Sequence, residues 1–131
     1  MVMTNPYEQY RQQGVMTASP MELIVMLYDG CVRQLKVAAL AYGENNRALA
    51  NEALLKAQAI VQELTLSLDR SYDIAKELFP IYEYAEDTIY QMIQTGEHTA
   101  LKDLTEIMAD LRGTWNEVAR QTRAASLAIE E

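Results

Sequence analysis

Residues that could carry acid–base, metal or nucleophilic chemistry are few in this chain. It contains one histidine, His98, and one cysteine, Cys31. A di-metal site in a helical bundle needs Glu-x-x-His pairs on two helices, but the residue three before His98 is Thr95 and no second histidine exists. Cys31 lies on an apolar stripe, where a cysteine without a nearby base is expected to be a small buried side chain. The sequence therefore predicts no catalytic residue, no metal site and no cofactor.

Composition and charge restrict the class of protein further. The 131 residues are 50% apolar and 23% charged, which fits one compact domain. Nineteen acidic residues against eleven basic ones give a net charge of −8, which disfavours non-specific binding to nucleic acid. A single cysteine excludes an intramolecular disulfide, and no apolar run has the length of a signal peptide or a membrane span. We expect a cytoplasmic protein that does not insert into a membrane.

The apolar residues recur at intervals of three and four, which predicts helices and no strand. Ser19-Pro20-Met21-Glu22 is a strong helix start, with a hydroxyl cap, proline at the first helical position and glutamate three residues after the cap. Predicted helices run over 19–43, over 46–69, from Ser71 to Gly96 and from Thr99 to Thr122. Because the turns are short, consecutive helices must be antiparallel. The predicted fold is an all-α, antiparallel up-down four-helix bundle over 19–122, with a tail over 123–131 that continues the last helix or frays.

Several local features of the helices can be predicted as well. Pro80 lies inside the third helix and predicts a kink, or a break near Phe79. Asp29 and Arg33 are one turn apart and are expected to form an ion pair. The third helix is acidic, which usually indicates a solvated outer face and occasionally a docking patch for a basic partner. Its carboxylates are Asp73, Glu77, Glu83, Glu86 and Asp87.

The first helix has more apolar residues than one face can bury. Residues 23–28, Leu-Ile-Val-Met-Leu-Tyr, are six apolar residues in succession and surround the helix. The third helix adds Phe79, Tyr84, Tyr90 and Ile93 beside its core stripe, and tyrosines are frequent binding anchors. In one interpretation the first helix is central and the tyrosines are half-buried edge residues. In the other, an apolar groove receives an amphipathic helix from another chain.

The first eighteen residues are a candidate cover for that groove. They are polar, are interrupted by Pro6 and Gly14, and are too short to fold alone. Tyr7 and Tyr10 are three apart, so one helical turn would place both rings on the same side. We expect residues 1–18 to form a flap that packs on the bundle and occupies the groove while no partner is bound.

Short motifs along the chain carry a family resemblance. They are Asn5-Pro6-Tyr7 with Tyr10, Val15-Met16-Thr17-Ala18-Ser19-Pro20, Glu22-Leu23, Met26-Leu27-Tyr28-Asp29-Gly30, Ser67-Leu68-Asp69, Ile81-Tyr82-Glu83-Tyr84 and Leu111-Arg112-Gly113-Thr114-Trp115. Together these segments closely resemble the FliS family of flagellar export chaperones, over residues 4–120. Two departures stand out. After Ser67-Leu68-Asp69 the family usually has a Gly-Gly pair, whereas Arg70-Ser71 follows here. The second departure is Pro80, which precedes the tyrosine motif at 81–84.

The resemblance implies an antiparallel four-helix bundle that binds the disordered C-terminal region of newly made flagellin in the cytoplasm. Such proteins prevent premature polymerisation and deliver the subunit to the flagellar type III export apparatus. In the family the N-terminal segment occupies part of the client groove and is displaced on binding, a role that would fall to Tyr7 and Tyr10. The implied partners are the flagellin C-terminal region, the export gate and regulatory proteins that share the groove.

The apolar surplus and the family motifs together predict a set of client contacts. They are Tyr7, Tyr10, Leu23, Met26, Leu27, Tyr28, Tyr82 and Tyr84. The leading hypothesis is therefore a non-enzymatic flagellin chaperone. The alternative is a structural or regulatory helical bundle that self-associates through the same apolar face and has no unfolded client.

Overall fold

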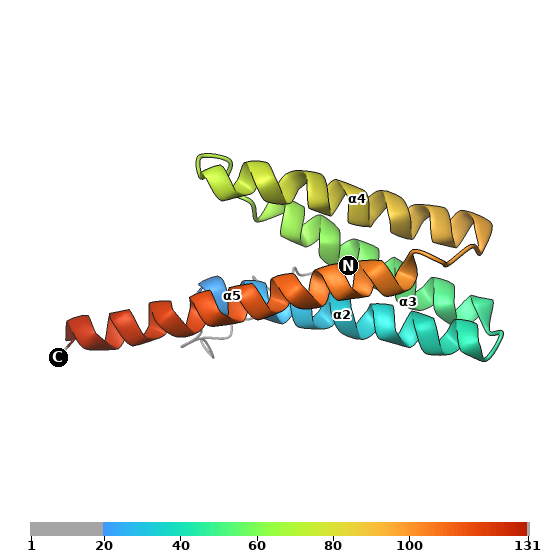
Figure 1. Ribbon diagram of the computed structural model, residues 1–131, viewed down its shortest axis with the longest axis horizontal. Helices are drawn as coiled ribbons and strands as arrows, with labels where there is room; N and C mark the ends of the chain where they lie inside the picture. Colours follow the sequence, from blue (N-terminus) through green and yellow to red (C-terminus); the bar gives the residue numbers. More distant parts are fainter. Residues whose placement is uncertain (1–19, 131) are drawn as a thin grey trace, which may run out of the picture.

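The computed structural model describes the backbone of residues 20–130, which holds four α-helices, and the side chains of residues 21–122. They are α2 (Pro20–Gly43), α3 (Arg47–Leu66), α4 (Asp73–Thr95) and α5 (Leu101–Glu130). Figure 1 shows that consecutive helices run in opposite directions, and residues 20–130 contain no strand. The predicted all-α, antiparallel four-helix bundle is confirmed. The predicted flap over 1–18, with Tyr7 and Tyr10, and the Ser19 cap lie outside the described residues.

Gly43 to Asn46 form the predicted short polar turn between α2 and α3, but the left-handed residue in it is Asn45 and not Gly43, where it is expected. Helix α2 ends at Gly43, and Asn45 takes a positive φ of 57°. The side chain of Asn46 then accepts a hydrogen bond from the N–H of Leu49 at 3.0 Å, which caps α3. Short-range signals of this kind depend only on neighbours in sequence, so they are readable without the fold.

Helix α3 ends three residues before its predicted limit at 69. The hydroxyl of Ser67 donates to the carbonyl of Glu63 at 2.7 Å, and its backbone N–H bonds to the same carbonyl. Serine competes for backbone hydrogen bonds in this way and favours helix ends. Leu68, expected on the helical stripe, lies in the turn and packs against the core from there.

Helix α4 runs through Pro80 without the break expected near Phe79. Proline cannot donate to the carbonyl of Lys76, but both residues are exposed, so water can satisfy that carbonyl. Ser71, where the predicted third helix begins, does not cap α4. The N-cap residue is Tyr72, which makes no side-chain cap, and the hydroxyl of Ser71 donates instead to Asp69 at 2.6 Å.

The connection to α5 is longer than predicted. Helix α4 ends at Gly96, which adopts a left-handed φ of 75° as its position after the stripe predicts. Helix α5 begins at Leu101 and not at Thr99, because Thr99 lies in the turn that joins the N–H of Leu101 to the carbonyl of His98. At its other end the backbone of residues 123–130 continues α5.

The helices do not pack equally against one another. Helix α2 packs along both α3 and α5, whereas α4 packs along α3. The largest fully buried side chains of the core are Tyr28, Tyr82, Leu35, Leu54, Leu64, Ile89, Met92, Leu104 and Met108. In Figure 1, α4 diverges from α2 and α5 toward the left, where α4 begins. The backbone of α4 therefore diverges from those of α2 and α5 toward the start of α4.

Candidate functional site

Exposed apolar side chains gather where α2 begins, α3 ends and α4 begins. Because consecutive helices are antiparallel, these three segments lie at the same end of the bundle, on the left of Figure 1. Met26, Leu66, Tyr72 and Ile74 are all exposed there, and Leu66 is 79% exposed. We call this region, residues 21–28, 62–68 and 72–81, the open end. These four exposed side chains make the open end a candidate site for a partner.

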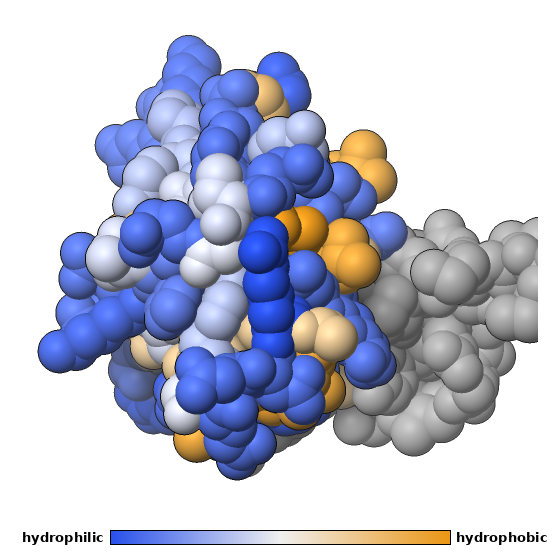
Figure 2. Space-filling model, turned by 90° about the vertical axis from the view of Figure 1, so that its right-hand side faces the viewer, coloured by the Kyte–Doolittle hydropathy of each residue, from blue (hydrophilic) through white to orange (hydrophobic). Residues whose placement is uncertain are grey.

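The opposite end of the molecule has a mainly hydrophilic surface. Figure 2 looks at that end, where apolar colour is confined to small areas. Leu40, Leu49 and Tyr90 are exposed on the segments that lead to it. Scattered exposed apolar residues are ordinary on a protein surface, so this end is a weaker candidate for a partner site.

The apolar run at residues 23–28 is divided between core and surface. Leu23, Leu27 and Tyr28 are buried, whereas Met26 is 39% exposed. Ile24 and Val25 are intermediate. The bundle thus buries one side of the run, and the side that remains is available to another chain.

The predicted client contacts fall into different environments. Met26 and Tyr84 are exposed, the latter by 45%. Leu23, Leu27, Tyr28 and Tyr82 are core residues in this conformation, because they lie on the sides of α2 and α4 that face the other helices. These four side chains are therefore not accessible to a partner in this conformation.

A buried polar centre joins Tyr28 and Tyr82. Their hydroxyls are hydrogen bonded, and their ring centroids lie 6.3 Å apart at an interplanar angle of 54°. Trp115 on α5 is partly buried and packs against the same core cluster. Sequence periodicity gave no sign of the contact between Tyr28 and Tyr82, because it joins distant segments of the chain.

Burial keeps the groups of this centre uncharged. It is the main cause of a raised pKa at both tyrosines, and the neighbouring Tyr82 raises the pKa of Tyr28 further. Burial also raises the pKa of the Cys31 thiol to about 12. At neutral pH the centre therefore offers hydrogen bonds and apolar contact, and it holds neither a charge nor an activated nucleophile.

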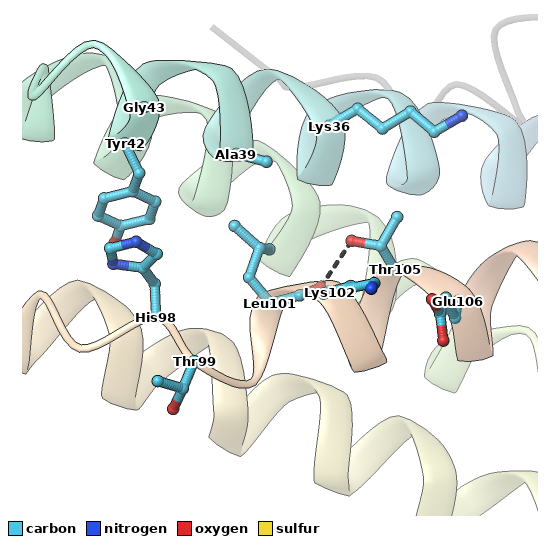
Figure 3. Close-up of a pocket in the computed structure, with 10 residues that line it drawn as sticks. All are labelled: Lys36, Ala39, Tyr42, Gly43, His98, Thr99, Leu101, Lys102, Thr105 and Glu106. Atoms are coloured by element: carbon cyan, nitrogen blue, oxygen red, sulfur yellow. Dashed lines mark hydrogen bonds between the residues drawn. The ribbon is translucent and has the colours of Figure 1, made fainter.

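A hollow lies between α2 and α5, near the end of α2. It has a volume of about 520 Å³ and is drawn in Figure 3. The lining residues are Lys36, Ala39, Tyr42, Gly43, His98, Thr99, Leu101, Lys102, Thr105 and Glu106. His98 is exposed, as predicted, and its ring stacks on that of Tyr42 with centroids 3.8 Å apart. None of the polar lining side chains is buried, so this hollow lacks the fixed polar groups of a specific ligand site.

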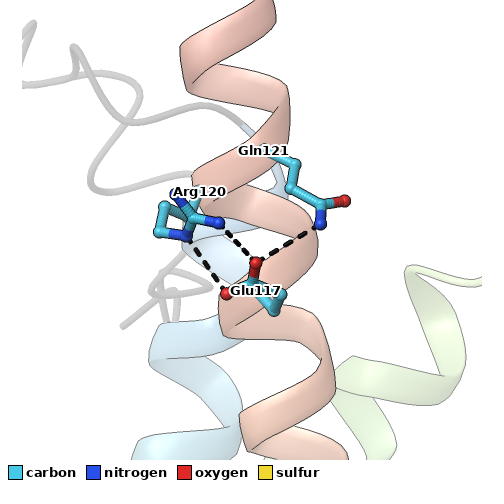
Figure 4. Close-up of polar contacts among 3 residues, drawn as sticks. All are labelled: Glu117, Arg120 and Gln121. Atoms are coloured by element: carbon cyan, nitrogen blue, oxygen red, sulfur yellow. Dashed lines mark hydrogen bonds and ion pairs between the residues drawn. The ribbon is translucent and has the colours of Figure 1, made fainter.

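The charged residues of α5 pair mainly along their own helix. Glu117 accepts hydrogen bonds from Arg120 and Gln121, as Figure 4 shows. The bond from Arg120 is the main cause of the lowered pKa of Glu117. These side chains are exposed, so the cluster is a local helix-stabilising contact and not part of the candidate site.

The described part of the chain shows neither a metal site nor a membrane-spanning helix. Within it, no group of three or more histidine, cysteine, aspartate or glutamate side chains is placed to hold a metal ion. The helices described also include none that is long and apolar enough to cross a membrane. The open end is therefore the strongest candidate site among the described residues.

Comparisons with known proteins agree on one family. Residues 3–122 match the family model described as flagellar protein FliS. The flagellar secretion chaperone FliS of Bacillus subtilis is 32% identical over 123 residues, which cover 94% of this chain and 92% of that protein. The protein of the same name from Escherichia coli is 28% identical over 109 residues, which cover 81% and 80%. In structure, the chain is similar to a bacterial flagellar chaperone with a TM-score of 0.72 at 21% identity, over 88% of this chain and 95% of that one.

Proposed function

The chain belongs to the FliS family of flagellar secretion chaperones, and from this premise we propose that it binds the disordered C-terminal region of flagellin in the cytoplasm before export. The binding is non-covalent and involves no catalytic step. By covering that region it prevents premature polymerisation of the subunit and aids its delivery to the export apparatus. The export gate is then a second partner, and regulatory proteins that share the groove are a third.

The observation that carries this proposal is the incomplete burial of residues 23–28. Met26 is exposed, and Ile24 and Val25 are only partly covered. An amphipathic helix from a client would bury such side chains along its apolar face. Complete burial of one methionine or aliphatic side chain contributes about 1.5–3 kcal/mol, so a few of them supply useful affinity.

The client contacts divide according to exposure. Met26 on α2 and Tyr84 on α4 are available for direct contact in the structure as it stands. Leu23, Leu27, Tyr28 and Tyr82 are buried in the core and support the helices that carry these two side chains. Methionine adapts to different partner shapes, and tyrosine offers a broad ring with a polar tip.

The N-terminal segment completes the proposal. Residues 1–18, with Tyr7 and Tyr10, compete with the client for the groove while no client is present. Their sequence supports this role, because two tyrosines at a spacing of three can present both rings together. Competition of this kind reduces the apparent affinity for the client by the fraction of molecules whose groove is occupied.

Titration calorimetry with a C-terminal fragment of flagellin tests the function directly. We expect saturable one-to-one binding with a negative heat-capacity change, because apolar surface is buried and the client becomes ordered. A scrambled fragment of the same composition is the control. Absence of saturable binding by a chain whose helicity is intact would contradict the proposal.

The alternative function is self-association without an unfolded client. Leu55 and Leu66, eleven residues apart on α3, are both exposed and lie near one face of that helix, which favours a contact with a second copy. Sedimentation separates the two functions. A tight dimer that the flagellin fragment neither dissociates nor binds would support self-association, whereas a monomer that forms a one-to-one complex would exclude it.

A further inference from the structure

Helix α4 is attached to the rest of the bundle unevenly. It packs along α3, whereas along α2 and α5 its contacts are sparse. Its hydrogen bonds to α2 in the described structure come from two places, one near its C-terminal end and one at its middle. These two hydrogen bonds therefore help to set the position of α4 relative to α2.

The C-terminal end of α4 is fixed by several groups. The hydroxyl of Tyr42 donates to the carbonyl of Met92 at 3.5 Å. The guanidinium of Arg47 donates to the carbonyls of Ile93 at 3.2 Å and Gln94 at 3.3 Å. These contacts bind the last turn of α4 to α2 and α3, so this end is the fixed end of the helix.

The middle of α4 is held by the buried polar centre. The hydroxyl of Tyr82 is hydrogen bonded to that of Tyr28 on α2. Both side chains are buried, so this bond joins α4 to α2 inside the core.

The N-terminal half of α4 has no comparable attachment. Among the described residues, none from 73 to 81 forms a hydrogen bond to α2 or α5. Phe79 contacts the guanidinium of Arg70, 4.5 Å from the ring centroid, but Arg70 belongs to the connection from α3. This half of α4 is also the half that borders the open end.

We propose that Tyr28 and Tyr82 form a positioning cluster that sets the distance of the N-terminal half of α4 from α2, and with it the width of the client groove. The choice of client rests on the function proposed above. The positioning itself is a property of the chain alone and can be tested without any client.

Hydrogen bonds are suited to this task because they are directional. Apolar contacts between α4 and α2 would allow the helices to slide and separate gradually, since the hydrophobic effect has no preferred geometry. Two hydroxyls that are buried together lose their partners if the helices separate without admitting water, and an unpaired buried hydroxyl is unfavourable. The cluster therefore favours one spacing over nearby alternatives.

Hydrogen exchange on the full chain tests the positioning. The double variant Tyr28→Phe/Tyr82→Phe removes both hydroxyls and keeps both rings. We expect exchange of the amides at 73–84 to become faster, on the order of tenfold, while exchange in α3 changes less. The single variant Tyr82→Phe should show a smaller change in the same segment, and it serves if the double variant loses helicity. Tyr90→Phe, on the exposed surface of the same helix, is the matched control and should exchange like the unmodified protein.

Two exchange results would overturn the proposal. In one, residues 73–84 exchange at the unmodified rate in both variants. In the other, exchange rises by the same factor in all four helices, which would make the hydroxyls a general contribution to core stability.

Binding of the flagellin fragment tests the link to the groove. A groove of fixed width binds a helix without first becoming ordered, so the double variant is expected to bind several-fold more weakly than Tyr90→Phe. Equal affinity despite faster exchange would overturn the link between the cluster and the client. If the unmodified protein itself fails to bind the fragment, the proposed function fails, while the exchange result still decides whether the cluster positions α4.

Discussion

Asp29 on α2 forms its ion pair with Arg112 on α5, with 3.6 Å between Oδ1 of the aspartate and Nε of the arginine. The sequence predicts a pair between Asp29 and Arg33, one turn along the same helix, and that prediction is wrong. Arg33 is exposed, whereas Arg112 and Asp29 are both partly covered at the contact between α2 and α5. The pair therefore joins two helices that border the candidate site.

Removal of this pair is expected to destabilise the protein slightly. Arg112→Gln should lower the free energy of unfolding by less than about 1 kcal/mol, because both side chains retain access to water, and added salt should reduce the difference. A double-mutant cycle with Asp29→Asn, measured by urea unfolding, isolates the interaction. The matched control is Arg33→Gln, for which we expect almost no change; an equal loss in that variant would favour the local pair.

Met26 should contribute to the affinity of the open end for the flagellin fragment. Met26→Ser is expected to weaken binding of the flagellin fragment several-fold in calorimetry, with little effect on stability, because the side chain is 39% exposed. Leu40→Ser is the matched control, since Leu40 is 70% exposed on the same helix but near its other end. If both variants lose the same affinity, the client does not distinguish the two ends of α2.

The segment 1–18 should compete with the client. Its deletion is expected to raise affinity for the flagellin fragment, because the groove is then open in every molecule. Calorimetry of the full and shortened chains at equal helicity measures the difference. Unchanged or weaker binding by the shortened chain would show that the segment contributes contacts instead of competing.

The end of α4 should depend on the absence of a side chain at Gly96. Its φ is 75°, and a Cβ there would lie 3.0 Å from the guanidinium carbon of Arg47. Gly96→Ala is therefore expected to lower the free energy of unfolding by about 1–2 kcal/mol. Gly113→Ala is the control, because Gly113 is helical with nothing within 4 Å of a new Cβ, and it should gain about 0.5–1 kcal/mol. A loss of equal size in both variants would contradict this explanation.

Stability should fall in alkaline solution because of the buried centre. Burial raises the pKa of Cys31 from 9.0 to about 12, and burial together with Tyr82 raises that of Tyr28 above 10.0. Well below pH 9 both groups are protonated in the folded and unfolded chains, so they add no pH dependence there. Above it the unfolded chain releases protons that the folded chain retains, and the free energy of unfolding falls by up to about 1.4 kcal/mol per pH unit for each group.

Urea unfolding between pH 8 and pH 11 measures this slope. Tyr28→Phe removes one of the groups that favour the unfolded chain, so its slope above pH 10 should be shallower than that of the unmodified protein. Tyr90→Phe, at an exposed position, should keep the original slope. A steep slope that persists unchanged in Tyr28→Phe would mean that other groups control alkaline unfolding.

The sequence by itself determined the elements and their order. Gly43 and Gly96 mark the ends of two helices, and Asn46 caps a third, because each acts on backbone groups within a few residues. The stripes of apolar residues at three and four specify which side of each helix is buried, and short turns specify antiparallel neighbours. The apolar surplus at 23–28 was also readable, and Met26 does remain exposed.

Only the tertiary structure decided which side chains meet. The hydrogen bond between Tyr28 and Tyr82 and the pairing of Asp29 with Arg112 both join residues on different helices. Periodicity gives the direction of a side chain around its own helix, but it gives neither the rotation nor the spacing of one helix against another. Those quantities are set by packing of the whole core, so the contacts between helices had to be observed.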